Sequence, residues 1–256
     1  MRSLILPKRS IKPRNSGISM IIDTGIPLNN VRDYLNMASN HIDYVKLGWG
    51  TALVTQNLKE KIALYKEYNI PISLGGTFFE LAYLQNKLPQ LREYLQEMKI
   101  EYLEISDGTI ELEVKEKVEL IKYFKNDFKV LSEVGSKDIK KVISPKKWVE
   151  EIKATLDAGA WKIIAEGRES GQAGLYRDSS EIRTGLIDEI IDDIPISDLI
   201  FEAPQKAQQA WFINNFGTEV NLGNIAFSSI IGLETLRLGL RSDTLINLHG
   251  ENNDSN

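Results

Sequence analysis

The amino-acid sequence predicts a single (β/α)8 barrel, and three observations support this prediction. The chain has 256 residues, a usual length for one such barrel. Eight short apolar or β-branched runs recur along it, each followed by an amphipathic helical stretch or by a loop that leads to one. No linker separates a second domain, and strict alternation of strands and helices favours a parallel sheet covered by helices. Eight such units close into a barrel more naturally than they form the alternative, an open doubly wound sheet.

The predicted strands are short, as expected for strands that are buried on both faces. In chain order they cover Ile18–Ile22, Ile42–Leu47, Ile70–Leu74, Tyr102–Ile105, Lys129–Ser132, Trp161–Ala165, Asp198–Phe201 and Glu219–Leu222.

The helices between these strands have their own start and stop signals. Ser144 followed by Pro145 is typical of a helix start, and Gly159 of a left-handed stop. Asn57 can cap another helix, and Gly217 ends the helix that contains Trp211, Phe212 and Phe216. The apolar stripes expected to face the strands are Trp148, Ile152 and Leu156; Leu58, Ile62 and Tyr65; and Val114, Val118, Ile121 and Phe124. We expect the barrel domain to cover residues 1–245, and residues 246–256 to form a polar, disordered tail.

Composition excludes several kinds of chemistry. The net charge of -5 disfavours a nucleic-acid or anionic-membrane surface. The absence of cysteine excludes disulfides, thiolate nucleophiles and cysteine-ligated metals. The two histidines, His41 after a predicted helix and His249 in the polar tail, are poorly placed for catalysis. Acid–base chemistry is therefore expected on Lys, Asp, Glu or Tyr. Neither a signal peptide nor a membrane span is predicted, so we expect a cytoplasmic protein, and exposed apolar helix faces suggest a homo-oligomer.

Polar residues collect where the predicted strands end, which in a closed barrel is where the active site is built. A glutamate after a buried strand cannot face the helix layer without a cation, so we expect it to point into the barrel mouth. The alternative is that each carboxylate forms only a structural salt bridge. Oxygen ligands without His or Cys suit Mg²⁺ or Mn²⁺ rather than zinc. The strand-end residues are Asp23, Lys46, Gly75-Gly76-Thr77, Glu104 with Asp107, Glu133, Glu166, Glu202 and Asn221.

Cationic and backbone groups could bind an anion beside these carboxylates. Arg168 lies in a glycine-bounded turn that suits bidentate anion recognition, although it could instead pair with Glu169 on the surface. The segment 221–225, Asn-Leu-Gly-Asn-Ile, is expected to run into a helix whose first N–H groups form a phosphate cradle, or to be an ordinary turn. The candidate cations are Lys46, Lys137, Arg168 and Lys206.

Seven segments in register resemble the phosphosulfolactate synthase family. They are 12–14 (KPR), 46–51 (KLGWGT), 75–77 (GGT), 133–137 (EVGSK), 166–171 (EGRESG), 201–204 (FEAP) and 221–225 (NLGNI). The resemblance spans about Lys12 to Thr244. It implies a βα-barrel lyase that uses Mg²⁺ to add sulfite to phosphoenolpyruvate, giving (2R)-2-O-phospho-3-sulfolactate for coenzyme M or sulfolactate formation. The family also includes plant relatives linked to heat-stress tolerance, so fold alone does not settle function.

Roles for the site residues are then assigned by position and chemistry. Lys137 is the expected general acid, with Lys46 as the alternative. The expected metal ligands are Glu133, Glu166 and Glu202, with Glu104 and Asp23 in reserve. The expected substrate-binding residues are Arg168, Glu104, Asn221, Gly223 and Asn224. Two other functions stay open: a Schiff-base aldolase that uses Lys46 or Lys137, and a non-catalytic, stress-related barrel.

Overall fold

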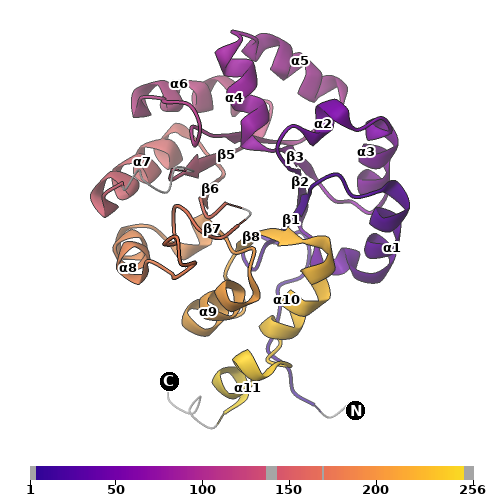
Figure 1. The fold of residues 1–256 in the computed structure, drawn as a ribbon, viewed down its shortest axis with the longest axis vertical. Helices are drawn as coiled ribbons and strands as arrows, with labels where there is room; N and C mark the ends of the chain where they lie inside the picture. Colours follow the sequence, from indigo (N-terminus) through magenta and orange to yellow (C-terminus); the bar gives the residue numbers. More distant parts are fainter. Residues whose placement is uncertain (1–3, 137–142, 169, 251–256) are drawn as a thin grey trace.

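The eight strands form one closed parallel barrel in the order β1 to β8, with β8 paired to β1. The computed structural model describes residues 4–136, 143–168 and 170–250. The predicted (β/α)8 barrel is thus confirmed (Figure 1). The strands are β1 Ser19–Asp23, β2 Tyr44–Leu47, β3 Ile72–Leu74, β4 Tyr102–Ile105, β5 Lys129–Val134, β6 Lys162–Ala165, β7 Leu199–Glu202 and β8 Leu222–Ala226.

Helices surround the barrel as an outer ring (Figure 1). The α-helices are α1 Leu28–Ala38, α2 Thr51–Val54, α3 Leu58–Glu67, α4 Gly76–Leu84, α5 Leu88–Glu97, α6 Val114–Phe124, α7 Pro145–Ala158, α8 Thr184–Asp193, α9 Lys206–Phe216, α10 Ile230–Arg237 and α11 Ser242–His249. Short 3-10 turns cover Ser39–His41, Ile196–Asp198 and Phe227–Ser229. None of the described helices is both long and apolar enough to cross a membrane.

Most of the predicted helix signals lie where expected. Helix α7 follows Ser144, starts with proline, and ends at Gly159, whose φ of 110° is left-handed. Helix α3 starts after Asn57, and α9 ends before Gly217. The buried stripe of α6 differs at its start, because Val114 is exposed whereas Lys117 is buried.

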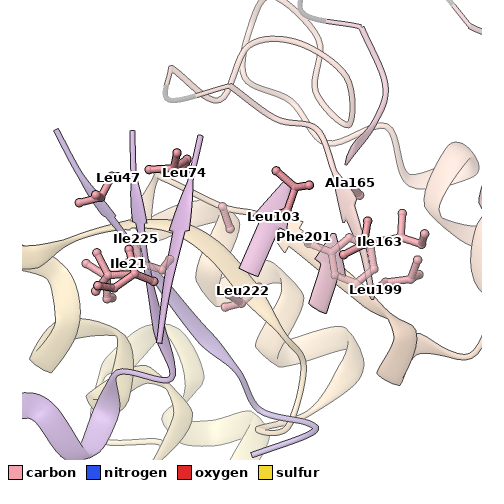
Figure 2. Close-up of a cluster of buried hydrophobic side chains, with 14 of the residues drawn as sticks. Ile21, Leu47, Leu74, Leu103, Ile163, Ala165, Leu199, Phe201, Leu222 and Ile225 are labelled. Carbon is pink, nitrogen blue, oxygen red and sulfur yellow. The ribbon is translucent and has the colours of Figure 1, made fainter. Parts of the chain in front are cut away.

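The strands are buried on both faces, which explains their continuous apolar runs. Their outward-facing side chains form the larger core, between barrel and helices; Figure 2 shows Ile21, Leu103 and Ile163 among them. Their inward-facing side chains fill the barrel itself, in a smaller cluster of Ile18, Met20, Tyr44, Tyr102, Leu131, Ile164 and Ile200. This interior packing supports the layer of polar residues described below.

Strands β2 and β3 begin two residues later than predicted and β5 ends two residues later, and the larger differences lie at β8 and α11. Strand β8 begins at Leu222 rather than Glu219, because the Val220 N–H bonds back to the Gly217 carbonyl in a turn, whereas the Leu222 N–H donates to the Ile18 carbonyl beside β1. Residues 246–249, expected to be disordered, complete helix α11. Tertiary hydrogen bonds hold these residues, since the Asn247 side chain donates to the Asn214 carbonyl and His249 Nε2 pairs with the Leu238 carbonyl, which the local polar composition does not reveal.

Candidate active site

A pocket opens at the carboxyl ends of the strands, where most of the predicted site residues meet. It is lined by Ile22, Lys46, Trp49, Gly75, Gly76, Thr77, Glu104, Glu133, Glu166, Arg168, Glu202 and Asn224. Seven of these residues were given a catalytic, metal-binding or substrate-binding role from the sequence: Lys46, Glu104, Glu133, Glu166, Arg168, Glu202 and Asn224.

Strand alternation explains why the charged residues face the pocket. Successive side chains on a strand point to opposite faces, so residues two apart share a face. On each of five strands, a residue of the barrel interior precedes a charged residue by two positions: Tyr44 and Lys46, Tyr102 and Glu104, Leu131 and Glu133, Ile164 and Glu166, and Ile200 and Glu202. The charged residues are therefore the top layer of the barrel interior.

Lys46 links the two sides of this layer. Its Nζ lies 2.8 Å from Glu202 Oε1 and 3.3 Å from Glu104 Oε2, and the residue is only 5% exposed. Burial lowers the pKa of Lys46, but the surrounding glutamates outweigh burial and hold that pKa well above its usual range. An ammonium held in its charged form is a poor Schiff-base nucleophile, which argues against an aldolase that uses Lys46.

Backbone N–H groups orient three of the carboxylates, from the segment after the preceding strand for Glu104 and Glu202 and from its own loop for Glu166. Gly76 N donates to Glu104 Oε1 at 2.7 Å, and Gly167 N donates to Glu202 Oε2 at 3.0 Å. Arg168 N donates to Glu166 Oε1 at 2.6 Å. These hydrogen bonds fix the carboxylates before any ligand arrives, which lowers the cost of ordering them on binding.

Sequence reasoning missed two residues that support Glu133. The Ser106 hydroxyl lies 2.7 Å from Glu133 Oε1 and 2.6 Å from Glu80 Oε1, and all three side chains are buried. Strand alternation could have revealed Ser106. It lies two positions after Glu104, directly after the end of β4, so its side chain is expected on the same face. Nothing local indicates Glu80, which packing of α4 brings to this position.

Several predicted residues do not line the pocket. Asp23 follows the inward-facing Ile22, so it points outward, where its Oδ2 accepts hydrogen bonds from Lys61 and Tyr65 of α3. The Lys206 ammonium pairs with Asp243 on the exterior, and Asp107 pairs with Lys117. The prediction of Asp23 as a reserve ligand and of Lys206 as a site cation is therefore wrong. Lys137 lies outside the described residues.

The predicted phosphate cradle at residues 221–225 is also wrong in its geometry. Gly223 and Asn224 lie within strand β8 rather than at the start of a helix. Asn221 precedes that strand, and its side chain binds backbone groups of Ile18 and Leu199 at the amino ends of neighbouring strands. Asn221 therefore lies at the end of the barrel opposite the pocket. Gly223 points into the barrel below the pocket, where a Cβ would meet Met20 Cε at 2.6 Å.

The donor set of the pocket suits a hard divalent cation. The described lining residues include four glutamates against one lysine and one arginine, a formal charge of -2. Their ligand atoms are oxygens, which Mg²⁺ and Mn²⁺ prefer. Among the described residues, no three or more His, Asp or Glu side chains are grouped as a metal site. Since Mg²⁺ usually takes only one or two protein carboxylates and completes its shell with water and substrate oxygens, the residues still fit this ion. The assignment of Glu133, Glu166 and Glu202 as its ligands stays a prediction.

The sequence of this chain is similar to those of several phosphosulfolactate synthases. The sequence model of the family described as (2R)-phospho-3-sulfolactate synthase (ComA) matches residues 7–243. The phosphosulfolactate synthase of Bacillus subtilis (strain 168) is 48% identical over 245 residues, covering 94% of this chain and 97% of the relative. That of Methanothermobacter thermautotrophicus is 41% identical over 247 residues, covering 94% of this chain and 96% of the relative.

Solved structures with a similar fold have little sequence in common with this chain. The YdjI aldolase of Escherichia coli K12 superimposes with a TM-score of 0.57 at 12% identity, covering 94% of both chains. The 3-hexulose-6-phosphate synthase of Salmonella typhimurium gives a TM-score of 0.56 at 11% identity, covering 91% of this chain and 100% of the other. These similarities show the barrel fold alone, and the reaction must be argued from the residues of the pocket.

Proposed function

The chain belongs to the phosphosulfolactate synthase family, and from this membership we propose that it adds sulfite to C3 of phosphoenolpyruvate in a Mg²⁺-dependent reaction. The product would be (2R)-2-O-phospho-3-sulfolactate. The family makes the protein an enzyme of the carbon–sulfur lyase type. The observation that supports the proposal most strongly is the match over residues 7–243, which includes every charged residue of the pocket layer.

The proposed reaction makes one carbon–sulfur bond and retains the phosphate. The sulfite lone pair attacks C3, and the electron pair of the C2–C3 double bond moves toward C2 and the substrate carboxylate. A proton added at C2 then completes the product. A Mg²⁺ ion held by pocket glutamates would neutralise the charge that develops on the substrate carboxylate.

Three charged residues would have separate roles in this reaction. Arg168 would bind an anionic group of one substrate, because its guanidinium can donate two parallel hydrogen bonds to an oxyanion. Lys46 would offset the charge of Glu104 and Glu202 and hold both carboxylates in place. Lys137, our candidate for the proton donor to C2, follows Ser136, which is buried two residues after the end of β5.

The direct test is a reaction of the purified protein with phosphoenolpyruvate, sulfite and Mg²⁺, followed by mass spectrometry. We expect consumption of phosphoenolpyruvate with the phosphate retained, and a product heavier by the elements of sulfurous acid. Omission of sulfite, or chelation of the metal, should stop the reaction. Release of inorganic phosphate, or consumption without sulfite, would contradict the proposal.

The Lys137 assignment is tested by its alanine variant. Lys137→Ala should abolish turnover while leaving phosphoenolpyruvate binding largely intact, measured by calorimetric titration. A near-normal rate would show that another group protonates C2.

We further propose that the enzyme is a homo-oligomer. Large apolar side chains are exposed on its helices, among them Leu53 and Val54 of α2 and Ile246 of α11, at 59%, 79% and 76% exposure. Adjacent exposed apolar side chains, such as Leu53 and Val54, would be buried by association of two copies. Light scattering on the purified chain measures its mass directly, and a monomer at all concentrations would contradict the proposal.

A further inference from the structure

Strand β8 contains one extra residue opposite β1, directly at the pocket. Ser19 and Ile21 of β1, two positions apart, pair with Leu222 and Ile225 of β8, three positions apart. The extra residue makes a β-bulge, a feature common beside active sites because it redirects a side chain. Within it, Asn224 has a φ of 55°, in the left-handed region that non-glycine residues seldom occupy.

The bulge decides which way Asn224 points. Gly223 faces the barrel interior, so in a regular strand Asn224 would face the helices and Ile225 the interior. Instead Asn224 lines the pocket, while Ile225 keeps an outward-facing place in the larger core beside Ile21. The backbone irregularity thus brings a carboxamide to the barrel mouth without disturbing the packing on either side.

The Asn224 carboxamide is buried but not satisfied. The residue is 5% exposed, its Oδ1 has no hydrogen-bond partner, and its Nδ2, the donor atom, has no acceptor among the residues that the structure describes. Its backbone N–H faces only the sulfur of Met20, at 3.4 Å. A buried polar atom without a partner and a left-handed non-glycine residue both cost free energy, and such costs collect where a ligand binds. Two other lining residues, Trp49 and Arg168, have φ values of 53° and 54°.

Strand order shows what kind of ligand fits beside Asn224. The four glutamates of the pocket lie on the consecutive strands β4 and β5 and at the ends of β6 and β7. The other half of the barrel contributes Asn224 from β8, Ile22 from β1 and Lys46 from β2, and none of the described lining residues on that half is acidic. The first half favours a cation, whereas an anion beside Asn224 meets no acidic lining residue on its own half. A carboxamide carries two N–H donors, which suit an anion without adding charge.

We propose that the Asn224 side chain donates a hydrogen bond to an oxyanion oxygen of a bound substrate, which is either the phosphate ester or the sulfite. The inference rests on the proposed function, because that function supplies these two anions. It replaces the backbone cradle expected at residues 221–225 with a single side chain positioned by a bulge.

Three variants test the inference by calorimetric titration with phosphoenolpyruvate, sulfite and inorganic phosphate, each in the presence of Mg²⁺. Asn224→Gly removes the carboxamide but favours the same backbone conformation, so the bulge should persist. Asn224→Asp keeps the shape and adds a negative charge. Asn86→Gly is the matched control, since Asn86 also has a left-handed φ, of 56°, but is exposed on a turn outside the pocket.

We expect Asn224→Gly to weaken binding of one anion by about 10- to 100-fold, the usual loss of a hydrogen bond to a charged group. Weakened binding of phosphoenolpyruvate and phosphate identifies the phosphate as the acceptor, and weakened binding of sulfite alone identifies sulfite. Asn224→Asp should bind the same anion more weakly still, and Asn86→Gly should bind like the wild type.

Three results would overturn the inference: unchanged affinity of Asn224→Gly for all three anions, equal or tighter binding by Asn224→Asp, or no binding of any of them by the wild type. Tighter binding by the aspartate variant would point to a metal-ligating oxygen instead. Thermal melting checks that Asn224→Gly is folded, and if it is not, the aspartate variant alone decides. Because binding is measured without turnover, a wild type that binds these anions but forms no product refutes the proposed function and not this inference.

Discussion

Replacement of Lys46 by methionine should destabilise the protein strongly, because it leaves two buried glutamates without their cation. Methionine retains the length and the apolar stem of lysine and removes only the charge. Glu104 and Glu202 are each about 2% exposed or less, so water cannot take the place of the ammonium. The change therefore isolates the electrostatic role of the residue.

The magnitude follows from the two contacts. With an effective dielectric constant of about 20, Coulomb's law gives about 6 kcal/mol for the Glu202 contact at 2.8 Å and about 5 kcal/mol for the Glu104 contact at 3.3 Å. The cost of desolvating the ammonium in the wild type offsets several kcal/mol of this attraction. We expect a net loss of about 3–5 kcal/mol in the free energy of unfolding, as for other buried ion pairs that lose one partner.

Urea unfolding followed by circular dichroism measures this loss, with Lys206→Met as the control. Lys206 also pairs with a carboxylate, Asp243, but its side chain is 50% exposed, so its loss should change stability little. Because the folded-state pKa of Lys46 is raised, its contribution is fully present below the ordinary lysine pKa of about 10.4 and disappears only at higher pH. The deficit of Lys46→Met should thus be constant across neutral pH. A variant as stable as the wild type would refute the reasoning.

Three further predictions concern anion binding, alkaline stability and close packing. Arg168→Lys should raise KM for one substrate by about 10-fold, because an ammonium cannot replace a bidentate guanidinium; unchanged steady-state kinetics would exclude anion binding by Arg168. Burial and nearby carboxylates raise the pKa of Tyr102 to about 12, so the unfolded chain loses this proton first and stability falls as pH rises above about 10. In denaturant titrations, Tyr102→Phe should lose less stability than the wild type between about pH 8 and about pH 11. Equal losses would contradict the raised pKa of Tyr102. Gly76→Ala should cost about 1–3 kcal/mol or more, because its Cβ would lie 2.3 Å from Ser106 Cβ. Gly185→Ala, where a Cβ would meet no atom within 4 Å, should be neutral or slightly stabilising by the same unfolding assay, and equal effects of the two would refute the packing argument.

The top layer of the barrel was predictable because its geometry is local. A strand buried on both faces places residues two apart in the same layer, so a charged residue at the end of a strand extends the interior stack. Lys46, Glu104, Glu133, Glu166 and Glu202 all follow this rule. The same rule, applied one residue further, also explains why Asp23 turns outward to Lys61, since the inward position on β1 belongs to Ile22.

The support of that layer was not predictable from local pattern. Glu80 reaches Ser106 only because α4 packs over the end of β4, and Asn221 faces the far end of the barrel only because β8 starts later than its composition suggests. Tertiary hydrogen bonds of Asn247 with Asn214 and of His249 with Leu238 also hold the last turn of α11. In each case the deciding partner lies at least eight residues away in the chain.

The sequence by itself therefore determined the barrel, its strand order and the ring of charged side chains at its mouth, because alternation along a strand and spacing along a helix are short-range properties. Only the tertiary structure decided which way Asn224 points. Its direction depends on a bulge against β1, a strand about two hundred residues earlier in the chain, and the mismatch of one residue exists only when the barrel closes.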